Sequence, residues 1–283
     1  MAKLFVFLLI AHVFGDFIIQ NHTMCDGKFK EGIAGIHLYI HSVIIFYLSL
    51  IAIMYLEYWY VALIIAVTHF IIDGLKSKVE KIEINGCEIH DSGNELYTFV
   101  ADQILHIIVI YFCACWLNHL GWKEPLFLSA LNLKTLVFIL MFYVCGKPAN
   151  ILTRRVLIKL NIIKRNPKVE NDPKTGSIIG LVERRLIIFF MFVNQFAAIG
   201  FLITAKSILR FSDIKQSEDN KSDAISTNKY IADRSEYVLI GTFVSISIAA
   251  TCGFIIMIAG NPSMLSADNI IDTISASNYI IGH

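Results

Sequence analysis

Histidine and aspartate occur in this sequence as pairs four residues apart, and each pair lies within a long apolar run. The pairs are His12/Asp16, His37/His41, His69/Asp73 and Asp102/His106. Residues at positions i and i+4 of a helix lie on the same face, with their Cβ atoms about 5–6 Å apart. One zinc-binding helix motif, H-E-x-x-H, offers two ligands to the same ion at this spacing. Ionisable groups within a membrane span are costly and usually mark a functional site.

The depth of the four pairs is also consistent. The first and third pairs fall near the ends of their apolar runs, and the second and fourth fall near the starts. In an antiparallel bundle these positions face the same side. At 1.5 Å per residue, each pair would lie within roughly 5–12 Å of a helix end. The sequence therefore predicts one layer that contains five histidines and three aspartates.

Imidazole and carboxylate groups together suit zinc, manganese or iron, with zinc the first choice, and this set is large enough for one or two ions. With one ion, the remaining aspartates would orient the histidine ligands. The predicted metal ligands are His12, Asp16, His37, His41, His69, Asp73, Asp102 and His106. The three aspartates are also the candidate catalytic groups, as ligands or as a general base. The alternative is a metal-free hydrogen-bonded network or a proton path.

Further polar residues could contact a substrate or a lipid headgroup. Gln20, Lys76 and Gln103 lie close in sequence to the His/Asp pairs. A second polar set occurs later in the chain, and its candidate residues are Glu183, Arg184, Lys206 and Arg210. This later set would either bind a headgroup phosphate or anchor the helices at the membrane interface.

The composition indicates an all-α polytopic membrane protein that presents these residues from a helical bundle. Of the 283 residues, 56% are hydrophobic and 17% are charged, and the mean hydropathy is +0.63. Several apolar runs are long enough to cross a bilayer. The net charge of +1 gives no basic field of the kind that binds nucleic acid. The six cysteines show no zinc-finger or CxxC spacing.

The apolar runs predict about seven spans. They cover about residues 2–20, 33–56, 59–75, 96–120, 133–144, 178–205 and 237–259. The first run lacks a basic n-region and a cleavage site, so we interpret it as a retained helix rather than a signal peptide. We divide the chain into a four-helix core with the His/Asp site at residues 1–120 and a C-terminal transmembrane region at 121–283.

Loop charges predict the orientation. Lysine and arginine concentrate in the first, third and fifth loops, which are therefore expected to be cytoplasmic, with the N-terminus outside. The segment 150–163 has the pattern of an interfacial amphipathic helix. The stretch 212–235 is rich in Ser, Asp, Asn and Lys, and we expect a mobile polar loop there.

The motifs resemble those of a family of bacterial membrane proteins known as domain of unknown function 3307. The resemblance rests on H12-x-x-G-D-F-x-x-Q20, H37-x-x-x-H41, H69-F-x-I-D-x-x-K76 and D102-Q-x-x-H106. The later stretches 180–184, 205–211 and 236–242 are similar to the C-terminal half of longer members. The family implies a bacterial inner-membrane location and no established activity. A more distant likeness is to predicted membrane-bound metal-dependent hydrolases, which implies hydrolysis only by analogy.

Three functions remain open at this stage. The first is metal-dependent hydrolysis of a lipid-linked or phosphate ester at the inner leaflet. The second is transport of a divalent metal or a proton-coupled substrate through the same polar layer. The third is a non-catalytic sensor or assembly protein with a structural metal or polar network. The expected partners are the bilayer, a lipid or lipid-linked substrate, and a second copy or another protein.

Overall fold

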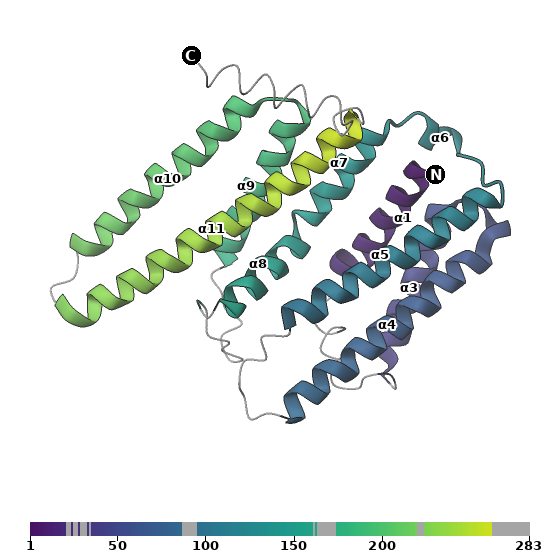
Figure 1. Ribbon diagram of the computed structural model, residues 1–283, viewed down its shortest axis with the longest axis horizontal. Helices are drawn as coiled ribbons and strands as arrows, with labels where there is room; N and C mark the ends of the chain where they lie inside the picture. Colours follow the sequence, from purple (N-terminus) through teal and green to yellow (C-terminus); the bar gives the residue numbers. More distant parts are fainter. Residues whose placement is uncertain are drawn as a thin grey trace, which may run out of the picture.

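A computed structural model describes residues 1–20, 24, 28, 33, 35–86, 95–160, 162, 174–219 and 224–261, with the backbone alone at 80–86, 174–177, 209–219 and 224–238. Every regular element in these ranges is helical, so the all-α prediction is confirmed. The elements are α1 Ala2–Phe14, η1 Gly15–Ile19, α3 Ile36–Ile53, η3 Leu56–Tyr58, α4 Trp59–Gly86, α5 Glu95–His119, α6 Leu126–Ser129, α7 Leu133–Val144, α8 Lys147–Lys159, α9 Lys174–Phe192, α10 Phe196–Asp219 and α11 Ala224–Gly260. The long helices lie side by side, with α9–α11 on the far side of α1 and α7 from α3 and α4 (Figure 1).

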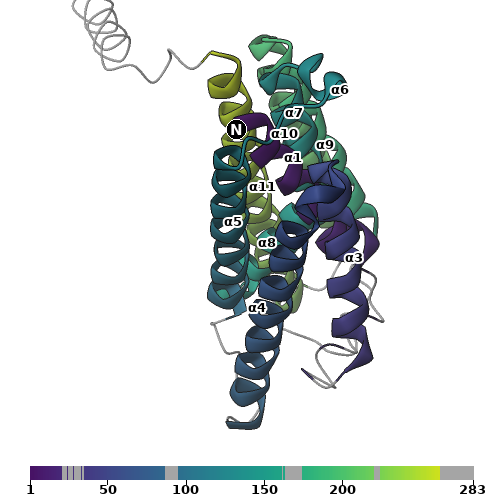
Figure 2. The same ribbon diagram turned by 90° about the vertical axis from the view of Figure 1, so that its right-hand side faces the viewer.

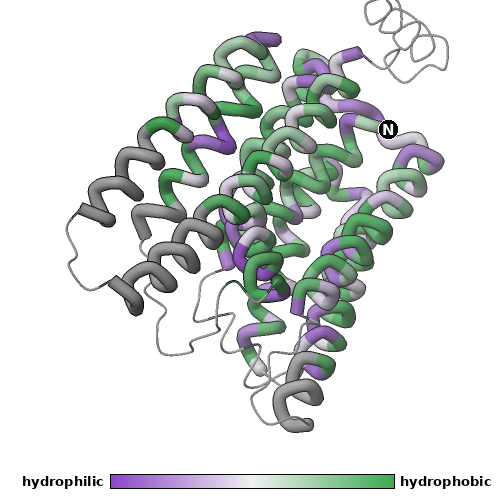
Figure 3. The backbone as a smooth tube through the Cα atoms, turned by 60° about the vertical axis from the view of Figure 1, so that its left-hand side comes forward, coloured by the Kyte–Doolittle hydropathy of each residue, from purple (hydrophilic) through white to green (hydrophobic). Residues whose placement is uncertain are grey.

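Five segments within the described ranges are long and apolar enough to cross a membrane. They are Ala2–Ile19, Ile36–Ile53, Leu56–Val79, Glu95–His119 and Leu239–Gly260. A sixth would be the pair α7 and α8, which are bent by 49° relative to each other. Apolar residues cover most of the length of these helices (Figure 3). The chain is therefore an integral membrane protein with five or six candidate spans among the described residues, close to the prediction of about seven.

The difference in count comes mainly from the run at 178–205, which was predicted as one span. The chain instead turns back between α9 and α10, where Asn194 adopts a left-handed conformation with φ of 60°. The backbone N–H of Gln195 then donates to the carbonyl of Phe190 at 2.7 Å. Hydropathy alone misses this turn because Asn194 and Gln195 are the only two polar residues between long apolar stretches on both sides.

The polar stretch at 212–235 also differs from the predicted loop. Residues 212–219 end α10, and residues 224–235 begin α11. Residues 220–223 lie outside the described residues. Lys, Glu, Gln and Ala are good helix formers, so a segment too polar for a bilayer can still extend a helix beyond it. The predicted amphipathic segment at 150–163 corresponds to α8 over most of its length.

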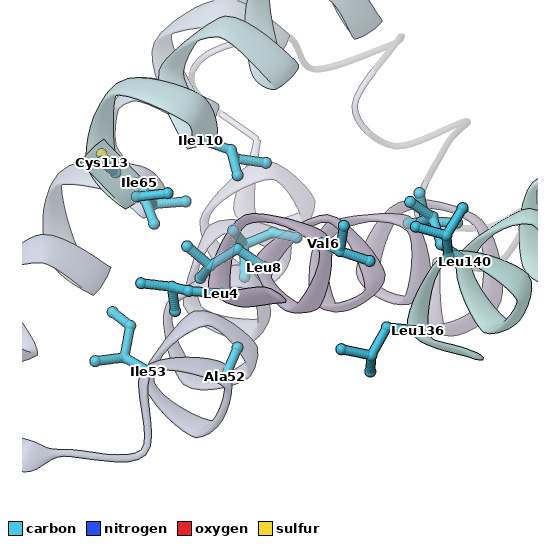
Figure 4. Packing of buried hydrophobic residues seen from close by; sticks show 14 of the residues in the cluster. Leu4, Val6, Leu8, Ala52, Ile53, Ile65, Ile110, Cys113, Leu136 and Leu140 are labelled. Atoms are coloured by element: carbon cyan, nitrogen blue, oxygen red, sulfur yellow. The ribbon is translucent and has the colours of Figure 1, made fainter. Parts of the chain in front are cut away.

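Helix α1 lies at the centre of the apolar packing. Leu4 and Leu8 are completely or almost completely buried. Figure 4 shows α1 with residues from four other helices around it. These are Ala52 and Ile53 of α3, Ile65 of α4, Ile110 and Cys113 of α5, and Leu136 and Leu140 of α7. Because the first helix contacts both halves of the chain, its rotation sets the direction in which its polar residues point.

Each helix around α1 has an inner and an outer stripe. On α3 the inner stripe is Leu38, His41, Ile45, Ser49 and Ala52, at steps of three or four, and Ile53 is buried next to its end. On α5 the corresponding stripe is Phe99, Asp102, His106, Ile110, Cys113 and Leu117. Large apolar side chains occupy the outer faces, among them Val43, Tyr47 and Ile51 on α3. An apolar outer face suits lipid, and the same periodicity turns the ionisable residues toward the bundle interior.

Candidate metal centre

Seven of the eight predicted ligands gather in one buried group where α1, η1, α3, α4 and α5 meet. We call this group the His/Asp cluster; its members are His12, Asp16, His41, His69, Asp73, Asp102 and His106. The carboxylates and imidazoles come from helices far apart in sequence. The predicted convergence of the i, i+4 pairs in one layer therefore holds for these seven residues.

The tightest part of the cluster is a triangle of three donor atoms. The Nε2 atoms of His41 and His69 are 2.9 Å apart. The Oδ1 atom of Asp16 lies 3.1 Å from the first and 3.3 Å from the second. Both histidines are buried, and the Asp16 side chain is only 9% exposed. Two imidazole nitrogens and one carboxylate oxygen thus face a common point.

Asp73 connects this triangle to the rest of the cluster. Its Oδ2 atom lies 3.6 Å from Nε2 of His69 and 3.8 Å from Nε2 of His41. Its Oδ1 atom lies 3.6 Å from Nε2 of His106. The two oxygens of one carboxylate therefore face two different groups of donors, an arrangement that suits a bridging ligand.

The second group of donors contains buried atoms without a hydrogen-bond partner. They are Nε2 of His12, Nε2 of His106 and Oδ1 of Asp102. The latter two atoms are 3.4 Å apart, and the rings of His12 and His106 have centroids 5.0 Å apart. An unpaired buried polar group costs free energy. The geometry fits a group that binds an additional ion or polar ligand.

The local structure of η1 explains how Asp16 reaches the other helices. The chain changes from an α-helix to a π-helix at Gly15, directly before Asp16. Such π-turns widen a helix locally and are frequent at functional sites. A Cβ atom at Gly15 would lie 2.5 Å from Cδ1 of Ile45, so the absence of a side chain lets η1 approach α3 closely. This approach brings Asp16 to His41.

Two lysines are paired with cluster carboxylates. Nζ of Lys28 lies 2.6 Å from Oδ2 of Asp73, and Lys28 itself is buried. Nζ of Lys76 lies 2.9 Å from Oδ2 of Asp102 and keeps partial exposure. Three aspartates and two lysines leave one negative charge uncompensated when all are ionised. A divalent cation would more than offset this charge.

Of the other polar residues predicted near the cluster, two glutamines bond to its aspartates and one histidine lies apart from it. The Gln103 amide donates to Asp102 at 3.1 Å. Gln20, with its amide oriented to satisfy both neighbours, donates to the carbonyl of Asp16 and accepts from Lys28, each at 3.1 Å. His37 is half-buried one turn before His41 and does not join the donor groups formed within the described residues.

Sequence reasoning missed Lys28. It lies in the segment between η1 and α3, where a lysine ordinarily points to solvent. No local pattern marks it, since its partner Asp73 is 45 positions away. Only the tertiary structure shows that this lysine neutralises a ligand of the cluster.

The later polar set is separate from the cluster. The guanidinium of Arg184 is buried and donates to the carbonyl of Cys145 at 3.0 Å, to Oγ of Ser245 at 2.8 Å and to Oδ1 of Asn150. We call this arrangement the Arg184 site. Glu183 pairs with Lys206 across α9 and α10. Arg210 is on α10, and its side chain lies outside the described part of the structure.

A comparison with protein families finds a match for the N-terminal part of the chain. Residues 4–133 match a family described as proteins of unknown function, DUF3307. Over these residues the chain is similar to the DUF3307 family. The match runs from α1 to the first residue of α7 and contains the whole His/Asp cluster. The later stretches that resemble longer members lie outside the match. No curated protein and no solved structure matches the chain.

Proposed function

We propose that the His/Asp cluster binds a divalent metal ion and that the protein uses it to hydrolyse a lipid-linked or phosphate ester. The observation that carries this proposal is the triangle of Asp16, His41 and His69, with edges of 2.9–3.3 Å. Ligands bound at about 2.0–2.2 Å around a tetrahedral ion are separated by similar distances. A neutral imidazole pair could share one proton, but it would not require a carboxylate at the same point.

Asp16, His41 and His69 would hold the ion, with Oδ2 of Asp73 as the nearest further donor. The donor set suits zinc first, and manganese or iron next. One ion is favoured by charge, because a second would raise the net charge of the cluster from +1 to +3 with Lys28 and Lys76 in place. A second ion at Asp73, Asp102 and His106 would need an anionic substrate beside it.

When bound, a divalent ion would activate water and polarise a phosphoryl or carbonyl oxygen. The side chains of the chain would supply the remaining functions. Asp102 has an unpartnered oxygen 3.4 Å from Nε2 of His106, so this pair can accept a proton from the attacking water. Lys76 bridges from Asp102 toward the surface and can contact an anionic substrate.

An alternative to the metal-dependent hydrolase is a non-catalytic polar network, and one observation favours this alternative. Lys28 and Lys76 already neutralise two of the three carboxylates without any metal. A carrier is less well supported, because the inner stripes of α3 and α5 beyond the cluster are largely apolar, with Ile45, Ala52, Ile110 and Leu117. A path across the membrane would have to pass through this packing.

For location, we propose the bacterial cytoplasmic membrane with the N-terminus outside. The support is the loop charge pattern together with the family. The cluster would then open toward the inner leaflet. A lipid or lipid-linked substrate could reach it from the bilayer, and a second copy or a partner protein could bind the C-terminal helices.

The experiment compares two histidines of the same helix. Metal content is measured by elemental mass spectrometry on the full-length protein in detergent, for the wild type, His41→Ala and His37→Ala. We expect one equivalent of metal in the wild type and in His37→Ala. His41→Ala should lower the affinity by about a hundredfold or more, since even outer-shell changes cost 10–100-fold.

Equal metal content in His41→Ala and the wild type would contradict the assignment of the triangle. Wild-type protein that stays folded and takes up no metal after reconstitution would favour the polar network. Asp16→Asn, which preserves shape and removes the charge, gives a second test if His41→Ala folds poorly. A metal-loaded wild type would then be assayed for release of phosphate or alcohol from phosphate esters and carboxyl esters.

A further inference from the structure

The pair of helices α7 and α8 is broken by a bend at membrane depth. The two helices are inclined by 49° to each other, with Cys145 and Gly146 between them. Helix α7 alone has 12 residues. Its length is therefore about 18 Å, whereas the hydrocarbon core of a bilayer is about 30 Å thick. Helices α9 and α11 pack against both α7 and α8, and Figure 2 shows α7 above α8 with α9 and α11 beside them.

The side chain of Arg185, on α9, reaches this bend. Its Nε atom is buried and has no hydrogen-bond partner. Its Cζ atom lies 4.2 Å from the ring centroid of Phe142, near the end of α7. A Cβ atom at Gly146 would lie 3.5 Å from Nη2 of the same guanidinium. The ring of Phe142 thus fixes the guanidinium beside a residue that has no side chain to fill the space there.

The neighbouring residue Arg184 does not supply a counter-charge. Its hydrogen bonds go to neutral oxygens, of Cys145, Asn150 and Ser245. Two guanidinium groups therefore follow each other in the chain at this depth. Among the described side chains of α7 to α11, Glu183 is the only carboxylate, and it pairs with Lys206. A charge inside the membrane without an opposite charge is costly and marks a functional site.

The outer face of α9 shows from which side the guanidinium can be approached. Ile178, Val182 and Phe189 are 59%, 48% and 46% exposed. They lie seven and three positions before Arg185 and four positions after it, so all four residues share one face of the helix. In a membrane, such an exposed apolar face meets lipid. Arg185 itself keeps partial exposure, which places it at the border between this face and the packed interior.

An anionic lipid has the chemistry that this position requires. Its phosphate oxygens can accept hydrogen bonds from the planar fork of a guanidinium, and such charge-assisted bonds are among the strongest in proteins. Its acyl chains would at the same time cover the apolar face of α9. A soluble anion would have to leave water and enter the apolar layer without this second contact.

We propose that Arg185 binds the phosphate group of an anionic lipid at the bend between α7 and α8. Phe142 holds the plane of the guanidinium, Gly146 leaves room for a phosphate oxygen, and the acyl chains lie along the exposed apolar face of α9. The residues of this lipid site come from α7 to α9. The site is therefore separate from the His/Asp cluster and does not depend on a metal ion there.

The test measures lipid binding to the full-length protein by native mass spectrometry in an uncharged detergent, with phosphatidylglycerol and phosphatidylcholine as the two probes. The wild type should prefer phosphatidylglycerol, because the choline group cancels the charge of the phosphate. Arg185→Gln should weaken the binding of phosphatidylglycerol by about tenfold, the loss of one charged hydrogen bond. Arg154→Gln removes the same charge from an exposed position on α8 and should change the affinity by less than about twofold.

A second variant separates binding from a merely structural role. Arg185→Lys keeps the charge and loses the planar fork, so it should weaken binding less than Arg185→Gln. This variant also provides the test if Arg185→Gln folds poorly, as judged by circular dichroism. Variants that lose stability and keep the wild-type preference for phosphatidylglycerol over phosphatidylcholine would show that Arg185 only stacks on Phe142, and the lipid site would be refuted.

The control probes can also refute the proposal. Equal weakening by Arg154→Gln and Arg185→Gln would mean that the lipid responds to overall charge and not to this site. Equal affinity of the wild type for the two lipids would exclude recognition of an anionic headgroup. Inorganic phosphate, titrated by calorimetry into the same protein, tests a soluble ligand. Its binding through Arg185 without binding of phosphatidylglycerol would overturn the assignment to a lipid.

Discussion

The His/Asp cluster and the Arg184 site are two buried charged regions with opposite properties. The guanidinium of Arg184 donates through all three of its nitrogens to oxygens of three other segments, namely Cys145, Asn150 and Ser245. The cluster instead contains buried atoms without a partner, on His12, Asp102 and His106. A satisfied buried charge fixes helices relative to one another, whereas converging donors left unpaired indicate a binding site.

The contrast changes the interpretation of Arg184. The sequence placed it with the headgroup contacts because it precedes an apolar run. In the structure its side chain is 2% exposed and connects α9 with α8, α11 and the end of α7. We therefore propose a structural role for Arg184.

The largest expected loss of stability comes from breaking the Lys28–Asp73 ion pair of the cluster. Asp73→Asn leaves Lys28 buried beside a neutral amide, and breaking a buried pair in this way costs about 3–5 kcal/mol. Thermal unfolding in detergent, followed by tryptophan fluorescence, measures the loss. The double variant Lys28→Met/Asp73→Asn should recover part of it. If Asp73→Asn alone unfolds like the wild type, Lys28 does not neutralise Asp73.

The next effect tests the structural role of Arg184. Arg184→Met keeps an unbranched apolar stem but no N–H donor, and it leaves three acceptors without their donors, at a cost of about 3 kcal/mol in the free energy of unfolding. Metal content per folded molecule should stay at the wild-type level. Unchanged stability together with weaker phosphate binding would restore Arg184 as a headgroup contact.

Zinc should stabilise the folded protein only through the His/Asp cluster. Zinc at a hundredfold excess over its Kd should stabilise the wild type by about 2.7 kcal/mol, because it binds the folded state alone. Addition of a chelator should reverse the gain, and His41→Ala should show neither change. An equal shift in His41→Ala would mean that zinc binds elsewhere on the protein.

The smallest effect is expected at the Glu183–Lys206 pair. Both side chains keep partial exposure, with 16% and 21% of their surface accessible. Glu183→Gln should therefore lower the stability by less than about 1 kcal/mol, and salt should reduce the difference further. A loss as large as that of Arg184→Met would show that the pair is shielded from water by lipid or by another chain.

The residues that sequence reasoning located correctly share one property: their relation to one another is local. A spacing of four residues places His69 and Asp73 on the same face of a helix wherever the helix lies. The apolar runs likewise define the spans, because the hydrophobic thickness of a bilayer fixes their length. The failures are also instructive. The same spacing groups His37 with His41, yet only His41 falls on the buried stripe of α3.

The sequence by itself therefore determined the class of the protein, its first four spans and the face of each helix that carries ionisable groups. The tertiary structure decided which atoms meet. Packing against α1 sets the rotation and the register of each helix, and these brought Asp16 to His41 and His69. The same packing buried Lys28 against Asp73, placed Arg155 over Phe99 and divided one apolar run at Asn194. Such contacts join residues tens of positions apart, and no local pattern encodes the angle at which two helices pack.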